Sequence, residues 1–135
     1  MNMRWLAVYC SLAALPAFAG ELLPAKIVSF DYPLLGVQSA TTGVVQVDCE
    51  VSKEGTIKAA RVASGPLLLG TRVLEGIASW RFRLLDSNAI PVAGSVVLYF
   101  DFTLTKAIPG PPKSTFTYEY PNRFIISASG WNRTH

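Results

Sequence analysis

Apolar and polar residues alternate most regularly between Val44 and Ser52, and this period of two predicts a half-buried strand. Lys53-Glu54-Gly55 then provides a turn, because glycine tolerates a positive φ. The return strand, Thr56 to Val62, alternates imperfectly, since Ile57 and Val62 lie an odd number of residues apart. Strict pleating cannot bury both side chains. The pattern therefore predicts a bulge near Ala59-Ala60, or a strand that ends early.

The period of the pattern changes from strand to helix after Ser64-Gly65-Pro66, where a capping residue precedes a first-turn proline. One apolar stripe at helical spacing follows, formed by Leu69, Val73, Ile77 and Trp80. Trp80-Arg81-Phe82 closes this predicted helix, and Trp80 is interpreted as core packing. Gly70 and Gly76 each weaken a helix by about 1 kcal/mol relative to alanine, so packing must hold it.

The most apolar strand face in the chain lies between Val96 and Leu104, after a loop that contains Pro91-Val92. The opposite face of this strand is more polar and consists of Val97, Tyr99, Asp101 and Thr103. A proline-containing linker at 108–112 separates this strand from an aromatic tail, in which one or two extra strands are an option. Tyr32 to Leu35 predicts a single helical turn near the start of the domain.

The elements together predict an α+β fold, with a three-stranded antiparallel sheet and one main helix packed on one face. An extra strand from the C-terminal tail is an option within this fold. The predicted division of the chain is a signal peptide at 1–19, a short segment at 20–31, the domain at 32–104 and the tail at 105–135.

The N-terminus has the pattern of a cleavable signal peptide: Arg4, an apolar run from Trp5 to Leu15, and the small-x-small site Ala17-Phe18-Ala19. The alternative is an uncleaved membrane anchor, but Pro16 interrupts the run well before the roughly 20 residues that a spanning helix needs. No other stretch is long enough to span a bilayer, so no stable membrane span is expected after cleavage.

Charge and cysteine content exclude several classes of protein. Loss of residues 1–19 leaves 11 basic and 9 acidic residues, a net charge of +2 that is too weak and scattered for a nucleic-acid surface. Cys49 is then the only cysteine, so an intramolecular disulfide or a thiol metal site is not expected. Its place on the apolar face favours a buried, inert thiol over a link between chains.

The sequence lacks the cluster of reactive side chains that an enzyme would need. The single histidine is the last residue, His135, which removes Ser-His-Asp and Cys-His arrangements. Asp48, Glu50 and Asp101 share a predicted sheet face and could bind a cation or act as acid and base, but a solvated polar face is the simpler interpretation. We therefore predict no catalytic residues, no cofactor and no metal.

Seven short motifs occur in an order and at spacings that resemble the C-terminal domain of TonB, the periplasmic protein that energises outer-membrane transporters. The resemblance covers residues 31–104. The motifs are Tyr32-Pro33, Gly43-Val44-Val45-Gln46-Val47, Gly55-Thr56-Ile57, Val62-Ala63-Ser64-Gly65, Trp80-Arg81-Phe82, Pro91-Val92 and Phe102-Thr103-Leu104. Each motif alone is common, and the specificity lies in their ordered combination.

The chain also departs from the family pattern. Leu84 stands where the family usually has proline, and Gly70 stands where it often has aspartate; both positions affect loop geometry rather than the fold. Residues 20–31 are too short to cross a periplasm at roughly 3.5 Å per residue, unlike the long spacer of a TonB-like transducer. The resemblance therefore implies the fold and the binding mode, but not energy transduction by this chain alone.

The resemblance implies a non-enzymatic periplasmic module that binds a protein or peptide partner, such as a segment of an outer-membrane transporter, by β-augmentation. In the family the last strand offers its edge to such a segment. That edge maps here onto the strand from Val97 to Thr103, so Val97, Tyr99, Asp101 and Thr103 are the expected partner-binding residues.

Two further arrangements stay open. Thr115 to Tyr120 could fold back onto the same edge, which would block it, or the chain could form a homodimer by strand or tail exchange. The alternative function is a component of a TonB-type energy-transducing system, anchored directly or through a partner.

Overall fold

The computed structural model describes residues 22–84 and 93–131 of the chain. Its elements, in chain order, are β1 (Leu22–Lys26), α1 (Leu34–Gln38), β2 (Gly43–Val51), β3 (Ile57–Ser64), α2 (Leu67–Ile77), β4 (Arg81–Leu84), β5 (Gly94–Ile108), β6 (Ser114–Glu119) and β7 (Arg123–Trp131). The predicted signal peptide, the loop at Pro91-Val92 and His135 lie outside the described residues. Within them, no helix combines the length and the apolar character needed to cross a membrane.

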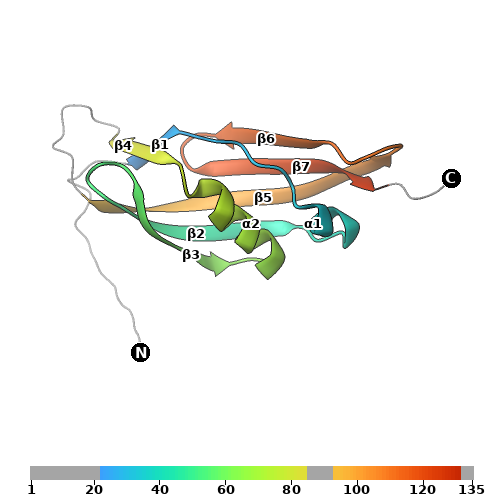
Figure 1. Cartoon of the computed structure of the whole chain (residues 1–135), viewed down its shortest axis with the longest axis horizontal. Helices are drawn as coiled ribbons and strands as arrows, with labels where there is room; N and C mark the ends of the chain where they lie inside the picture. The colour runs from blue at the N-terminus through green and yellow to red at the C-terminus, as the bar shows by residue number, and fades with distance from the viewer. Residues whose placement is uncertain (1–21, 85–92, 132–135) are drawn as a thin grey trace.

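Five strands form one sheet in the order β3-β2-β5-β7-β6, and β1 pairs with β4 in a separate two-stranded sheet (Figure 1). β2 is antiparallel to both β3 and β5, whereas β7 is parallel to β5 and antiparallel to β6. The predicted α+β class is confirmed, but the predicted three-stranded antiparallel sheet is wrong. The sheet is larger and mixed because the tail supplies two strands rather than a loose extension.

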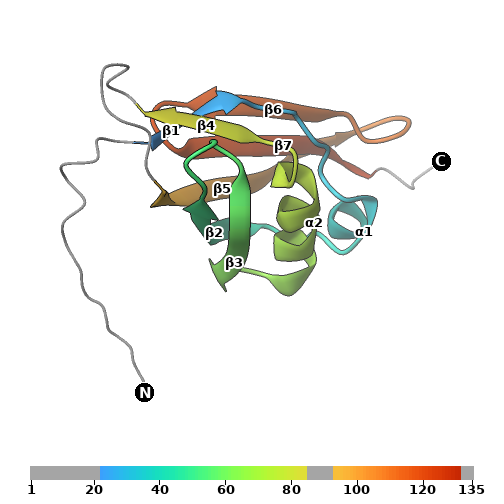
Figure 2. The same ribbon diagram turned by 60° about the vertical axis from the view of Figure 1, so that its left-hand side comes forward.

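Both helices lie on one face of the five-stranded sheet (Figures 1 and 2), where α2 packs against β2 and β3 and α1 packs against β7. Among the described residues, no helix or strand covers the opposite face, which we call the outer face. The inner face therefore carries the core, and the outer face carries the polar residues of each strand.

The hairpin of β2 and β3 follows the predicted pattern. Every second residue of β2 from Val45 to Val51 is buried, as the alternation required. The register shifts near the start of β3, where Glu50 pairs with Ala59 and Val51 with Ile57. Lys58 is the extra residue, so the bulge lies one residue before the predicted position, and β3 does not end early.

Helix α2 buries the predicted stripe: Leu69, Val73, Ile77 and Trp80 are each at most 1% exposed. The helix begins at Leu67, its N-cap is Pro66, and no side chain caps it, so the expected capping by Ser64 is not observed. Gly76 has a packing role, because a Cβ atom there would lie 2.3 Å from Cδ2 of the Phe30 ring. Phe30 thus packs directly on the helix backbone.

The helix ends at Ile77, so the prediction that Trp80-Arg81-Phe82 closes it is wrong. Arg81 instead opens β4, which pairs antiparallel with β1. The N–H of Phe82 donates a hydrogen bond of 2.8 Å to the carbonyl oxygen of Gly55. Gly55 has φ of 89°, and a Cβ atom there would lie 2.4 Å from the Phe82 oxygen, so glycine permits this close approach.

Trp80 lies at the centre of an aromatic cluster on the inner face. Its ring centroid is 4.8 Å from that of Phe124, 5.9 Å from that of Phe100 and 6.2 Å from that of Phe116. Its Nε1–H donates a 2.9 Å hydrogen bond to the carbonyl oxygen of Val28. Since Phe116 and Phe124 belong to β6 and β7, the tail and the preceding domain share one core.

Candidate functional site

The edge of β5 that the sequence led us to expect as open is occupied. β2 pairs with one side of β5, and β7 pairs with the other, with Tyr99 opposite Arg123 and Thr103 opposite Ser127. At the start of this ladder, Asn122 donates from Nδ2 to the Val97 oxygen at 2.8 Å and accepts from the Tyr99 N–H at 3.0 Å. The expectation of an open β5 edge is therefore wrong.

The strand that fills the edge is β7, and not the segment Thr115 to Tyr120 that we considered. That segment forms β6, which pairs with the far side of β7. β7 lies against β5 because its alternate side chains Phe124, Ile126 and Ala128 are buried on the inner face. The Phe124 ring stacks on Phe100, with centroids 5.0 Å apart and an interplanar angle of 16°. This period of two was present in the sequence and could have identified β7.

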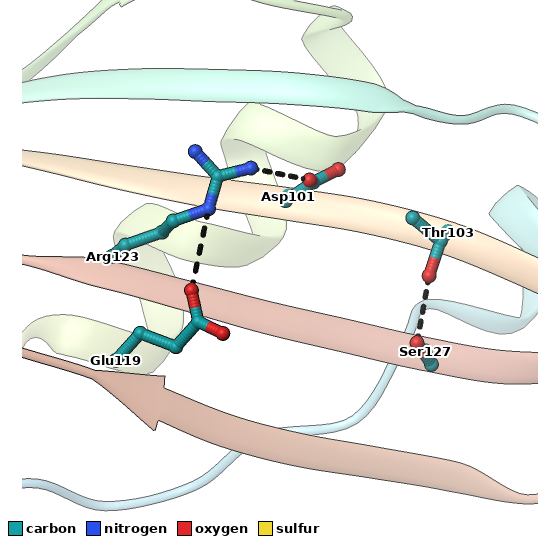
Figure 3. A network of polar contacts seen from close by, with 5 residues as sticks. All are labelled: Asp101, Thr103, Glu119, Arg123 and Ser127. Carbon is teal, nitrogen blue, oxygen red and sulfur yellow. Dashed lines mark hydrogen bonds and ion pairs between the residues drawn. The ribbon is translucent and has the colours of Figure 1, made fainter.

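On the outer face, polar side chains join β5 to the tail (Figure 3). An Nη atom of Arg123 lies 2.7 Å from a carboxylate oxygen of Asp101, and its Nε lies 3.7 Å from Glu119. The hydroxyls of Thr103 and Ser127 are hydrogen bonded at 2.7 Å. Two of the four expected partner-binding side chains thus contact the tail. As binding residues for another protein, all four stay a prediction.

The carboxylates of the outer face do not gather into a reactive site. Asp48 forms an ion pair with Arg61 at 2.9 Å, and Asp101 is paired with Arg123. Glu50 is exposed and is one of the residues that line a depression over β3, β2 and β5. In residues 22–84 and 93–131, no group of three or more His, Cys, Asp or Glu side chains is placed to hold a metal ion.

Cys49 is a buried free thiol in the second half of β2, as the sequence predicted. Its side chain belongs to the core, with 1% of the residue exposed. Burial, and then the negative charge of neighbouring Asp48, raise the pKa of the thiol to about 11. The thiol therefore stays protonated near neutral pH, where the thiolate is the reactive form.

Two strands form the edges of the five-stranded sheet, and they differ in regularity. β3 has two register shifts against β2 and carries the exposed basic residues Lys58 and Arg61. Bulges and charges of this kind obstruct the addition of another strand. β6 pairs with β7 from Ser114 to Glu119 without any register shift, and no lysine, arginine or proline interrupts it. β6 is therefore the edge better suited to pairing.

In the comparison with protein families, the family described as Gram-negative bacterial TonB protein C-terminal matches residues 28–104. This range is more than half of the chain, and it ends within β5. Among solved structures, the solution NMR structure of the Pseudomonas aeruginosa TonB CTD is similar, with 23% sequence identity and a TM-score of 0.49. The similarity covers 59% of this chain and 83% of that chain. No curated protein matches the chain.

Proposed function

Because the chain belongs to the TonB C-terminal family, we propose that it is a non-enzymatic protein-binding module that receives an extended partner segment at the outer edge of β6. The observation that carries this proposal is the regular pairing of β6, which has no register shift and no basic residue, at the end of the sheet. Strand addition at such an edge gives affinity through main-chain hydrogen bonds. The resemblance of the sequence to TonB supports a protein partner over a small molecule.

The two strands of the tail make β6, rather than β5, the edge strand on this side of the sheet. The family match ends at residue 104, and β6 and β7 come from the residues that follow it. β7 takes the place beside β5 that a partner segment would take in a domain without a tail, and β6 becomes the new last strand. A partner strand that entered at β5 would first have to displace the buried Phe124 and Ile126.

We propose that the module works in the periplasm and that its partner is an extended segment of an outer-membrane transporter. The signal-peptide pattern of residues 1–19 supports export, and the family membership supports this class of partner. We keep a proposed secondary contact at Val97, Tyr99, Asp101 and Thr103. Their side chains lie on the outer face of the sheet, and not at the free edge of β6.

Photo-cross-linking at the two edges of the sheet tests the proposal. A photoreactive residue at Thr117 lies on exposed β6, and the same residue at Ala59 lies on exposed β3 and serves as the control. We expect an adduct with an outer-membrane protein from Thr117 only. The lysine variants Thr117→Lys and Ala59→Lys provide a second matched pair, since an edge lysine obstructs strand addition. Adducts from Ala59 alone, or capture that Thr117→Lys leaves unchanged, would refute binding at β6.

A further inference from the structure

We propose that, in the absence of another partner, a second copy of this chain pairs with the β6 edge, so that two β6 strands meet antiparallel across a twofold axis. This inference rests on the proposed function only in using the same edge. Two features of β6 support it. The first is which residues turn their backbone N–H and C=O groups toward the free edge. The second is how the charged side chains at the two ends of β6 face each other when two copies pair antiparallel.

Hydrogen bonds at the start of β6 determine which residues turn their backbone toward β7. The Ser129 N–H donates to the Lys113 oxygen at 3.0 Å, and the Lys113 N–H donates to the Ser129 hydroxyl at 2.9 Å. In an antiparallel ladder such bonded pairs alternate with non-bonded pairs. Thr115 and Thr117 therefore turn their backbone groups toward β7, and Ser114 and Phe116 turn theirs toward the free edge.

This parity restricts how two β6 strands can meet. A twofold axis makes the contact isologous, so the same residues contribute from both copies. The outward backbone groups of one strand must face the outward groups of the other. An axis at Phe116 satisfies this condition and keeps the whole strand paired. In that register, Phe116 lies opposite its own copy, Thr115 lies opposite Thr117, and Lys113 lies opposite Glu119.

The charges of the strand complement one another in this register. Lys113 immediately precedes β6 and Glu119 is its last residue; both are exposed, and their even separation puts both side chains on the outer face. Antiparallel pairing about Phe116 brings each Lys113 to the Glu119 of the other copy. A parallel, in-register pairing would instead set like charges side by side, which is unfavourable.

Both charged side chains are available for this contact. In the part of the chain that the structure describes, Lys113 forms no ion pair with a carboxylate. Glu119 has a side chain that is 52% exposed, and its 3.7 Å contact is with Arg123, which is bound more closely by Asp101 at 2.7 Å. Glu119 can therefore accept a second cation without losing a buried contact.

Charge reversal tests the inference. We expect Lys113→Glu and Glu119→Lys each to weaken dimerisation about tenfold, because each replaces two cross-strand ion pairs by like-charge pairs. The double variant restores the opposite charges and is expected to recover the wild-type constant to within about twofold. Sedimentation velocity over a dilution series measures the dimerisation constant. The matched control is Lys58→Glu with Glu50→Lys, in β3 and β2 at the opposite end of the sheet from β6.

Cysteine pairs test the register. The full chain carries a second cysteine, Cys10, within residues 1–19, and it is replaced by serine for this test. A mixture of the Thr115→Cys and Thr117→Cys variants is then expected to form a disulfide between the two variants on mild oxidation. Either variant alone is expected to stay reduced, since each residue faces the other position across the axis. A disulfide of Thr117→Cys with itself would overturn this register.

The inference falls if the full chain is monomeric at all concentrations, or if the double variant dimerises no better than the single variants. Its failure differs from that of the proposed function. A monomer that still cross-links from Thr117 to an outer-membrane protein refutes the dimer and leaves the binding edge in place. A dimer that yields only adducts between its own copies refutes the binding of a transporter segment.

Discussion

Replacing Phe124 by alanine is the most direct test of whether the tail is part of the folded core or a detachable cover. Phe124 has no exposed surface, although it lies beyond the range matched by the family. Its ring touches side chains from three parts of the chain. The centroids lie 4.8 Å from Trp80, 5.0 Å from Phe100 and 5.0 Å from Tyr118.

The expected loss follows from these contacts. A buried phenylalanine replaced by alanine typically lowers the free energy of unfolding by about 3–5 kcal/mol, through lost transfer energy and the cavity left behind. Each well-placed aromatic pair adds about 0.5–1.5 kcal/mol beyond the buried area. The measured range for such substitutions already includes pair contributions of this kind. Because Phe124 has four aromatic partners, we expect Phe124→Ala to lie at the upper end, about 4–5 kcal/mol, which is a large share of the stability of a small domain.

Urea unfolding followed by circular dichroism measures this loss. Ile125→Ala is the control, because Ile125 is the next residue, lies on the outer face and is only half-buried; we expect it to cost about 1 kcal/mol. A single transition at lower urea, with an unchanged slope, would place the tail in the same cooperative unit as the domain. A loss of about 1 kcal/mol or less for Phe124→Ala would refute the shared core.

Three further predictions address other parts of the fold. Deletion of residues 107–135 is expected to increase aggregation and to abolish partner capture at β6, since it removes β6 and β7 and uncovers the β5 edge and the aromatic cluster; an unchanged gel-filtration profile would contradict this. Gly76→Ala is expected to destabilise by about 1–2 kcal/mol in thermal unfolding, because the clash with Phe30 outweighs the gain in helix propensity; a stabilised variant would show the contact to be absent. Burial raises the pKa of the Cys49 thiol from 9.0 to about 11, so the unfolded state loses its proton first, and stability is expected to fall between these pH values. The Cys49→Ala variant should fall less steeply over that range, and equal slopes would count against the raised pKa.

The sequence was most informative where a local pattern is long and regular. Alternation from Val45 to Val51 predicted β2 and its buried face, and the stripe through Leu69 and Val73 predicted α2. Both signals depend only on the period of the residues along one element. The resemblance to the TonB family was confirmed by the family match over residues 28–104, a range that includes both β2 and α2.

The sequence was least informative where an element depends on a distant partner. β4 is four residues long and is a strand because β1 pairs with it, although residues 27–80 lie between them in the chain. The prediction of an open binding edge at β5 was wrong for the same reason. Alternation correctly placed Tyr99 and Asp101 on the outer face, but whether a strand is an edge depends on every other strand in the sheet. No local pattern in β5 reveals that β7 lies beside it.

The strand order of the tail has a consequence for how the molecule is assembled. β6 precedes β7 in the chain but lies outside it, so the final strand fills a slot between two earlier ones. A growing chain that ends after β6 leaves this slot vacant, and β6 then lacks the strand with which it pairs, although Phe116 can still contact Trp80. The sheet can therefore be completed only after β7 has been synthesised, because β7 is the strand that joins β6 to β5.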